Sequence, residues 1–353
     1  MRAVVKASPG RGLDYSESIP DPVPGTGDVV VRVEATSICG SDMELYEWTA
    51  MAQAMEPELP VVAGHETAGV VTEVGADVRR VAIGDRVALE SHIFCGACGT
   101  CRRGDAHNCE RLRVLGFNHD GGFADFTCVP ESVCVGVPES VPPETAALLE
   151  PFGVAVHALQ RAGLQRVAGA SVLVNGCGPV GLFILNLASA LGASVLAGVE
   201  LNPYRRGLAE KAGAIGIDPG AGGVTARCEE LGLRRPGFDL AFEASGIDGM
   251  VTPLLQSVRR EGTVVTVGHP GRETPIDVAR YINKKGVELR GIFGRRVWDT
   301  WDLALDLVSG GRIDPSWLVT HRLAFSEVGK AMELLRSGAG KIILHPGGKN
   351  SSL

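Results

Sequence analysis

Residues 170–200, ASVLVNGCGPVGLFILNLASALGASVLAGVE, limit the possible folds of this chain more than any other segment. A short apolar run is followed by a glycine-rich turn, a segment with helical spacing of apolar residues, and a second apolar run. The helical spacing is carried by Val180, Phe183, Ile184, Leu187 and Leu191. Further apolar runs at 238–245 and 262–268 are typical of parallel strands covered on both faces. This part of the chain therefore predicts a doubly wound α/β sheet.

The first 150 residues follow a different pattern, rich in strands and turns. The runs at 28–39 and 67–78 alternate or carry β-branched residues, and Pro- and Gly-bearing breaks separate them, as in a compact β-barrel. The chain ends with a predicted helix, turn and strand, and we expect this last strand to return to the first domain. At 353 residues the chain exceeds the size of a single core, so we predict two domains. The barrel takes 1–151 and 291–353, and the parallel sheet takes 152–290.

Composition and charge exclude several classes of function. A net charge of −7 argues against nucleic acid or an anionic membrane as the main partner. No run of about 18 apolar residues is present, and the first residues do not resemble a secretory signal. Nine cysteines without such a signal favour a reducing compartment over a disulfide framework. We therefore expect a cytoplasmic protein that acts on a small molecule.

The turn in residues 170–200 has the spacing Gly176-x-Gly178-x-x-Gly181, with Pro179 and Val180 at the start of the predicted helix. The first glycine allows a tight turn, the second lets a pyrophosphate approach the backbone, and the third permits close packing of helix on strand. The helix N-terminus then faces the phosphates. This arrangement predicts a dinucleotide site, and the alternative is a glycine-rich turn without a ligand.

An acidic residue after the second strand indicates which dinucleotide is bound. Glu200 lies 19 residues beyond Gly181, where a carboxylate can accept hydrogen bonds from both ribose hydroxyls and repels a 2′-phosphate. NAD is therefore favoured over NADP. Arg205 and Arg206 follow closely and weaken this preference slightly, because a nearby arginine can accommodate a 2′-phosphate.

Four cysteines, Cys95, Cys98, Cys101 and Cys109, occur with the spacing C-x2-C-x2-C-x7-C. This spacing suits tetrahedral zinc, and four thiolates leave no position for water or substrate, so the site is predicted to be structural. A redox pair would need only two thiols. Iron–sulfur ligation and a zinc-ribbon module for nucleic acid are the remaining alternatives. His107, inside the loop, is expected at the surface.

A second group of possible zinc ligands consists of Cys39, His65 and Glu66. One thiolate, one imidazole and one carboxylate leave a tetrahedral position open, as a catalytic zinc requires. Taken singly, each residue has a structural alternative: a small core cysteine, a hydrogen-bonded histidine and a solvated charge. Together with the four-cysteine loop and the glycine-rich turn, they favour a catalytic metal.

The segments CGSD, GHETAGVV, EPFGVAVHAL and GCGPVGL, with the four-cysteine loop, resemble the zinc-dependent medium-chain dehydrogenase/reductase family over essentially the whole chain. SHIFCGACGTC, GIFGRRVWDTW and the closing THRLAFSEVGKAMELLRSGAGKIIL are similar to its threonine dehydrogenase subgroup. The resemblance implies a GroES-like barrel, a Rossmann domain and a small-molecule alcohol substrate. Relatives are usually tetramers, so it also implies a homotetramer, with a dimer as the alternative.

The resemblance also implies roles for individual residues. Cys39, His65 and Glu66 match catalytic zinc ligands, and Glu150 matches an acid that joins the zinc or holds its water. The other matches are Ser41 in proton transfer, His92 in activity of the threonine subgroup, Glu200 and Arg205 at the adenosine ribose of NAD, and Arg295 near the cofactor.

One position departs from the family pattern. Where relatives have C-G-T-D-x-H, this chain has CGSDME, so Glu44 stands in place of a histidine that relays protons. The implied reaction is NAD-dependent oxidation of a secondary alcohol, L-threonine to 2-amino-3-oxobutyrate or a related amino alcohol. A polyol, sugar or aminocyclitol dehydrogenase is one alternative, and a non-catalytic nucleotide-binding protein is another.

Overall fold

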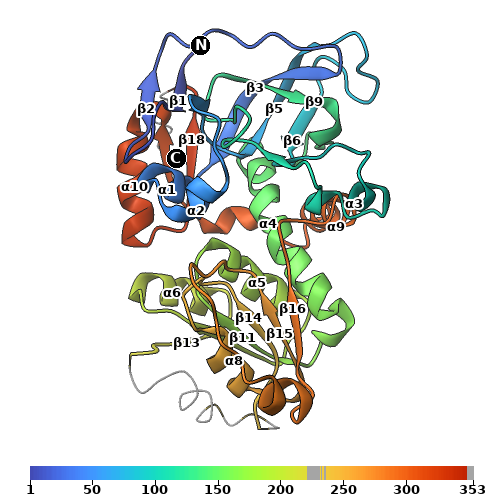
Figure 1. Cartoon of the computed structure of the whole chain (residues 1–353), viewed down its shortest axis with the longest axis vertical. Coiled ribbons are helices and arrows are strands. Elements are labelled where there is room, and N and C mark those ends of the chain that lie inside the picture. Colours follow the sequence, from blue (N-terminus) through green and yellow to red (C-terminus); the bar gives the residue numbers. More distant parts are fainter. Residues whose placement is uncertain (221–230, 232, 234–235, 348–353) are drawn as a thin grey trace. The chain divides into compact units, whose positions relative to one another are not determined.

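The computed structural model describes residues 1–220, 231, 233 and 236–347 of the chain. They form two compact units, Met1–Pro151 with Arg296–Leu353, and Phe152–Arg295 (Figure 1). The chain therefore leaves the first unit and returns to it after completing the second.

Most strands of the first unit form one seven-stranded sheet, with the order β10–β6–β5–β3–β18–β17 and β9 paired with β3 (Figure 1). The expected runs at 28–39 and 67–78 form its central antiparallel pair, with Val31 opposite Val71. Most residues of β3 are buried, and its Val29 and Val31 pack in a core that includes Val87 and Leu89. The strands are β3 (Asp28–Ser37), β5 (Glu66–Val74), β6 (Arg86–Leu89), β9 (Phe126–Pro130), β10 (Cys134–Gly136), β17 (Val319–Ala324) and β18 (Lys341–His345).

Two smaller sheets and several helices complete the first unit. The three-stranded sheet consists of β1 (Ala3–Lys6), β2 (Asp14–Ser16) and β4 (Val61–Val62), and the two-stranded one of β7 (His92–Ile93) and β8 (Arg113–Val114). The helices are α1 (Gly40–Glu47), α2 (Ala50–Ala54), α3 (Gly99–Arg102), α9 (Asp299–Ser309) and α10 (Val328–Ser337), with short turns η1 (Ala106–Asn108), η2 (Glu131–Val133), η5 (Pro315–Leu318) and η6 (Phe325–Glu327). Helix α4 (Pro143–Ala162) carries the chain from the first unit into the second.

The last strand returns to the first unit, as expected. β18 pairs antiparallel with β3, with Ile343 opposite Ser37, and parallel with β17. Helix α10 precedes it and buries Ala331 and Met332 in the same core as Ile342. The C-terminal segment therefore supplies both a strand and a covering helix to a sheet begun near residue 28.

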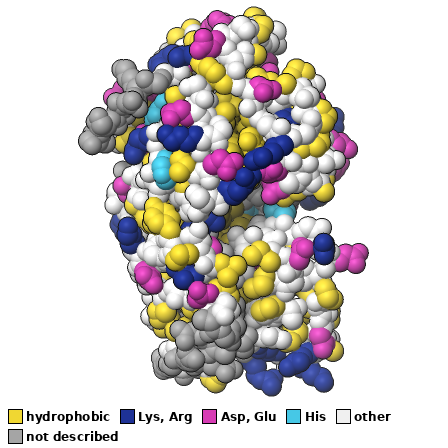
Figure 2. All heavy atoms as spheres, turned by 90° about the vertical axis from the view of Figure 1, so that its left-hand side faces the viewer, with side chains coloured by type: hydrophobic (Ala, Val, Ile, Leu, Met, Phe, Trp, Pro, Cys, Tyr) yellow, Lys and Arg dark blue, Asp and Glu magenta, His cyan; other side chains and the backbone are white. Residues whose placement is uncertain are grey.

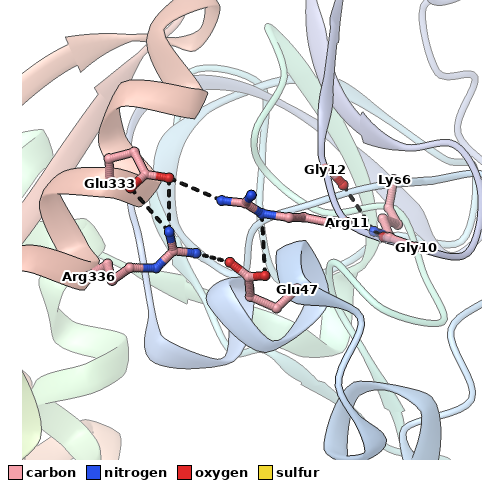
Figure 3. Close-up of polar contacts among 7 residues, drawn as sticks. All are labelled: Lys6, Gly10, Arg11, Gly12, Glu47, Glu333 and Arg336. Carbon is pink, nitrogen blue, oxygen red and sulfur yellow. Dashed lines mark hydrogen bonds and ion pairs between the residues drawn. The ribbon is translucent and has the colours of Figure 1, made fainter.

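Charged side chains join α1 to two other elements of the first unit (Figure 3). Arg11, in the loop between β1 and β2, lies 3.4 Å from Glu47 and 3.3 Å from Glu333. Arg336 of α10 pairs with the same two carboxylates. Lys6, the last residue of β1, donates hydrogen bonds to the carbonyls of Gly10 and Gly12 in that loop. The C-terminal end of α1 is thus tied to both α10 and the N-terminal loop.

The second unit is a six-stranded, all-parallel sheet with the order β13–β12–β11–β14–β15–β16 (Figure 1). The strand order reverses between β11 and β14, which confirms the predicted doubly wound fold. Helices α5 and α6 pack on β11, β12 and β13, and α8 packs on β14 and β15. The elements are η3 (Leu164–Arg166), β11 (Ser171–Asn175), α5 (Pro179–Ala190), β12 (Val195–Val199), α6 (Pro203–Lys211), β13 (Ile215–Ile217), β14 (Phe238–Glu243), α8 (Val251–Ser257), β15 (Val258–Thr266), η4 (Ala279–Asn283) and β16 (Glu288–Gly291).

The second unit extends a few residues beyond the predicted domain boundary. Residues 291–295 were expected in the first domain, but they belong to the second unit. The reason is hydrogen bonding beyond the end of β16: Ile292 N–H donates to Thr266 O, and Gly294 O lies 2.9 Å from Nδ1 of His157. These contacts hold the segment on the parallel sheet.

In the part of the chain that the structure describes, no helix is both long enough and apolar enough to cross a bilayer.

The apolar contact between α8 and the parallel sheet gives a test of the fold. Leu254 of α8 is fully buried in the core that includes Phe238 and Val264. We expect Leu254→Ala to lower the free energy of unfolding by about 2–5 kcal/mol, because a buried cavity is left behind. Chemical denaturation measures this change. Leu201→Ala is the control, because Leu201 is 62% exposed; equal effects of both changes would contradict this packing.

Candidate active site and metal centres

The register of β3 and β5 brings the first group of predicted ligands together. Ser37 at the end of β3 pairs with Glu66 at the start of β5, so Cys39, two residues further, reaches His65 and Glu66. One ligand atom from each of these three residues lies within 4.8 Å of the other two. Glu66 is fully buried and His65 nearly so. A thiol, an imidazole and a carboxylate thus converge at one buried point.

Asp42 fixes two of these three residues. Its Oδ2 accepts a hydrogen bond from Cys39 N–H at 2.8 Å, and its Oδ1 lies 3.3 Å from His65 Nδ1. Burial acts to lower the pKa of His65, but the nearby Asp42 and Cys39 outweigh it, so this pKa is raised well above its usual value. A carboxylate on one imidazole nitrogen orients the ring and leaves the other nitrogen for a metal.

The Glu66 carboxylate is held on one side only. Its Oε2 accepts hydrogen bonds from the Ser37 hydroxyl and from the ammonium of Lys341, a buried residue of β18 that also donates to Ile38 O at 2.9 Å. Its Oε1 is buried and has no hydrogen-bond partner among the described residues. Burial raises the pKa of Glu66, Lys341 opposes this change, and Glu150 adds to it. An uncompensated buried oxygen beside a thiol and an imidazole fits a cation.

Ser41 and Glu150 lie close to this group without belonging to it. Ser41 Oγ, in the first turn of α1, is 3.3 Å from His65 Nε2. Glu150 is buried in α4 and near enough to affect the pKa of Glu66. Its carboxylate is not part of the three-residue group within 4.8 Å. Its predicted role as a ligand therefore stays a prediction.

Glu44 and His92 are fixed by other contacts. Glu44 Oε2 accepts a hydrogen bond from the Thr49 hydroxyl at 2.5 Å, and that hydroxyl also caps α2. His92 is buried, and its Nδ1 lies 2.7 Å from Glu90 Oε1. The other oxygen of Glu90 accepts from Trp301 Nε1 at 2.5 Å. The orientation of the His92 ring is thereby set by two buried side chains.

The four cysteines predicted as a structural site also come together. Their sulfur atoms lie within 4.8 Å of one another. Backbone N–H groups donate to the sulfurs of Cys95, Cys98 and Cys109 at 3.3–3.4 Å. Such hydrogen bonds lower the pKa of Cys95 to about 6, whereas burial raises that of Cys101 to about 12. Backbone donors around clustered sulfurs favour thiolates, the form that binds zinc.

One expectation about this loop is wrong. His107 was expected at the surface, but it is buried in η1, and burial lowers the pKa of its imidazole. It is not part of the four-cysteine group.

The glycine-rich turn of the second unit has the geometry that a dinucleotide requires. Gly176 has φ of 90°, in the region that favours glycine. A Cβ on Gly181 would lie 1.9 Å from Gly176 O, so only glycine allows this contact. A Cβ on Gly178 would meet nothing within 4 Å, and this residue caps α5, with Pro179 and Val180 in its first turn. The helix N-terminus is therefore open to a phosphate.

The residues predicted at the adenosine ribose lie in the same unit. Glu200, at the end of β12, accepts backbone hydrogen bonds from Cys177 at 3.1 Å and Asn202 at 3.0 Å. It therefore lies beside the glycine-rich turn. Arg205 is in the first turn of α6. Arg206 pairs with Asp218 at 3.0 Å, so its charge is already compensated.

Arg295 is almost fully buried and is the last residue of the second unit. Its predicted role near the cofactor stays a prediction.

The comparisons with known proteins agree with this arrangement. Residues 25–139 match the alcohol dehydrogenase GroES-like domain, and residues 179–310 match the zinc-binding dehydrogenase family. L-Threonine 3-dehydrogenase of Pyrococcus horikoshii is 38% identical over 97% of this chain and 98% of its own. The chain belongs to the zinc-dependent medium-chain dehydrogenase family and is an alcohol dehydrogenase of the zinc type. The prediction of zinc and a nicotinamide dinucleotide is confirmed at the level of this family.

Solved structures give the same fold. An alcohol dehydrogenase of Escherichia coli CFT073, complexed with NADH, aligns with a TM-score of 0.88 at 26% identity and covers 98% of this chain and 99% of that one. The 2R,3R-butanediol dehydrogenase of Bacillus subtilis aligns with a TM-score of 0.86 at 29% identity, with the same coverage.

Sequence reasoning missed the residues that hold the predicted ligands in place. Asp42 could have been found, because it lies within CGSD, three residues after Cys39. Lys341 could not, because no local spacing connects it with Glu66. Glu90 and Trp301 are likewise far apart in the chain and meet only in the fold.

The Lys341–Glu66 pair gives a prediction about the metal. In Lys341→Met the buried Glu66 loses its counter-charge, and breaking a buried pair costs roughly 3–5 kcal/mol. We expect a lower unfolding midpoint and weaker binding of Co²⁺ at the Cys39 site, read from its absorption spectrum. Lys330→Met, at an exposed lysine of α10, is the control. Co²⁺ binding equal to that of the unmutated protein would show that Lys341 does not position Glu66.

The two cysteine sites are expected to respond differently to the loss of one thiol. Cys98→Ser and Cys39→Ser should each remove about one of two zinc ions per chain, measured by elemental analysis. Only Cys98→Ser is expected to lower the melting temperature strongly, because its metal holds together a loop that is otherwise closed only by the two-residue strands β7 and β8. Equal melting temperatures for both variants would refute the assignment of a structural and a catalytic site.

Proposed function

We propose that this protein oxidises L-threonine, or a closely related amino alcohol, at its secondary hydroxyl with NAD as the hydride acceptor. The single observation that carries the proposal is the three-residue group Cys39, His65 and Glu66, in which Glu66 Oε1 is buried without a hydrogen-bond partner among the described residues. Three protein ligands leave one tetrahedral position of a zinc ion for the substrate. The substrate follows from similarity to L-threonine 3-dehydrogenases at 35–38% identity over nearly the whole chain.

The bound groups would supply two things: zinc polarises the substrate oxygen, and the nicotinamide ring accepts the hydride. The side chains supply the rest. Asp42 holds Cys39 and His65, and Lys341 with Ser37 holds Glu66, so the three ligands keep their positions without rearrangement.

Ser41 is the first acceptor for the substrate proton in this proposal. Its hydroxyl lies 3.3 Å from His65 Nε2 and is partly exposed. A hydroxyl both accepts and donates, so Ser41 Oγ can take a proton from the substrate side as it releases its own proton to solvent. Glu150 and His92 are proposed to contact the substrate or its water, and both are buried side chains of the first unit.

The choice of NAD over NADP rests on Glu200 and Arg206. The Glu200 carboxylate lies beside the glycine-rich turn, where it repels a 2′-phosphate. Arg206, which could have accommodated that phosphate, is paired with Asp218. We therefore propose that NAD is the preferred cofactor, with Arg205 at the adenosine ribose and Arg295 near the cofactor.

One observation favours a second substrate class. Glu44 replaces the family's relay histidine, and the similar butanediol dehydrogenase acts, by its name, on a diol. A polyol or sugar alcohol is therefore the alternative substrate for the same chemistry.

A substrate screen tests the proposal. NAD reduction is followed by nicotinamide absorbance with L-threonine, other threo-amino alcohols, 2R,3R-butanediol and sugar alcohols, and NADP is compared with NAD. We expect the highest kcat/KM with L-threonine and NAD. A polyol with the higher value would establish the second class instead.

Cys39→Ser is the matched variant for this screen. Polarisation of the substrate oxygen by the metal is worth several kcal/mol. The Cys39→Ser substitution should therefore reduce kcat/KM by about a thousandfold or more while NAD affinity is retained. Parallel loss of NAD affinity and turnover would mean that Cys39 only supports packing. Tight NAD binding without turnover of any alcohol would favour a non-catalytic nucleotide-binding protein.

A further inference from the structure

A hollow of about 390 Å³ in the second unit is surrounded by positive charge. Its charged lining residues are Arg260, Arg280, Lys284 and Lys285, and we name it the basic hollow. Arg260 lies near the start of β15, and the other three come from η4 and the two residues after it. In Figure 2 a group of Lys and Arg side chains gathers at the lower right of the view. The neutral lining residues are Gln256 and Tyr281.

None of these four cations has a carboxylate within ion-pair distance in the described part of the chain. Arg260 Nη1 donates to Lys284 O at 2.9 Å, and Lys285 Nζ donates to Leu255 O at 2.7 Å and Gln256 O at 2.9 Å. The Arg280 guanidinium lies over the Tyr281 ring at 5.3 Å. These partners are carbonyl groups and a ring, so they leave the positive charge uncompensated.

A neighbouring hollow in the same unit is also lined by cations, but these have acidic partners. It has about 350 Å³ and is lined by Arg166 and Arg259. Arg166 pairs with Glu288 at 2.6 Å, and Arg259 pairs with Asp239 at 2.5 Å. Both arginines of this hollow are therefore matched by acids of the same unit, whereas the cations of the basic hollow have no such partners among the described residues.

The like charges that line the basic hollow repel one another. Burial lowers the pKa of Lys285, and the charges of Arg260 and Arg280 lower it further. A bound anion would remove this repulsion, because each cation would gain a charge-assisted hydrogen bond. The arrangement of the cations thus provides a reason for anion binding that does not depend on the proposed dehydrogenase reaction.

The surroundings limit the size of the anion. The Glu261 side chain lies over Gly286, and Asp277 caps the backbone N–H of Arg280, so acids flank the cations on two sides. The whole chain carries a net charge of −7 and repels long polyanions. A small, doubly charged or triply charged ligand fits these limits better than a nucleic acid does.

The basic hollow also lies away from the glycine-rich turn. Arg260 is near the first residue of β15, at the amino ends of the parallel strands. Gly176 follows the last residue of β11, at the carboxyl ends. A ligand in the basic hollow therefore does not compete for the dinucleotide position.

We propose that the basic hollow binds a small anion with two linked phosphate groups. Arg260, Arg280 and Lys284 hold the phosphate oxygens, and the carboxamide of Gln256 and the hydroxyl of Tyr281, joined at 2.9 Å, form the neutral wall. The ligand can be inorganic pyrophosphate or the diphosphate of a nucleotide, since both present the same groups.

Isothermal titration calorimetry on the full chain tests this proposal, with saturating NAD present to fill the dinucleotide site. Pyrophosphate, ADP, orthophosphate and a single-stranded oligonucleotide are the probes. We expect pyrophosphate or ADP to bind with 1:1 stoichiometry and at least tenfold more tightly than orthophosphate. Tighter binding of ADP than of pyrophosphate would identify the nucleotide as the source, and the reverse would identify the inorganic anion.

Two variants locate the site. Arg280→Gln with Lys284→Gln should weaken binding by about tenfold or more, because two charge-assisted hydrogen bonds are lost. Lys211→Gln with Arg312→Gln removes the same charge at exposed positions elsewhere and should leave the affinity unchanged. Dehydrogenase activity should be the same in both double variants, which separates this test from that of the proposed reaction.

Three results would overturn the proposal. They are no binding of pyrophosphate or ADP, equal affinity in both double variants, and tighter binding of the oligonucleotide than of either diphosphate. The last result would assign the basic hollow to a nucleic-acid surface.

Discussion

A buried carboxylate, Glu66, is the constraint on which the candidate active site depends. Moving a charge out of water costs several kcal/mol unless other charges and hydrogen bonds replace the water. Ser37 and Lys341 do this for Oε2, and nothing in the described residues does it for Oε1. Oε1, the oxygen that still lacks a positively charged or hydrogen-bonding partner, lies beside Cys39 and His65. The same desolvation that makes Glu66 costly therefore makes the site selective for a cation.

This constraint also explains the path of the chain. Lys341 belongs to β18, so the last strand must return to β3 before Glu66 has its counter-charge. Helix α10 packs on the core that also contains Ile342 of this strand. Together with the charged contacts of Arg11 and Arg336 with Glu47, it holds α1 against the strand. Exposed ion pairs of this kind contribute little each. Their effect here is on the position of α1, which follows directly after Cys39.

The sequence was sufficient to predict features whose residues lie within one short segment, and insufficient to predict contacts between distant segments. The glycine-rich turn and the four cysteines could be interpreted because each lies within one short segment, and the parallel sheet followed from its apolar runs. The contacts that support Glu66 and His92 could not be predicted, because any buried polar residue is a possible partner. Lys341 supports Glu66, and Glu90 with Trp301 supports His92. His107 was misplaced for a similar reason: a histidine among charged residues is typical of a surface, and only the fold shows that η1 buries it.

Glu44 shows how a departure from the family pattern can be accommodated without disturbing the fold. Its carboxylate is fixed by the Thr49 hydroxyl and lies one turn beyond Ser41 on α1. A carboxylate has no pair of ring nitrogens, one to accept and one to donate a proton, so Glu44 does not relay protons as a histidine does. In the proposed mechanism a proton leaving Ser41 therefore follows a different path from the one that a histidine at position 44 would provide, and this departure is the reason that a polyol stays an alternative substrate.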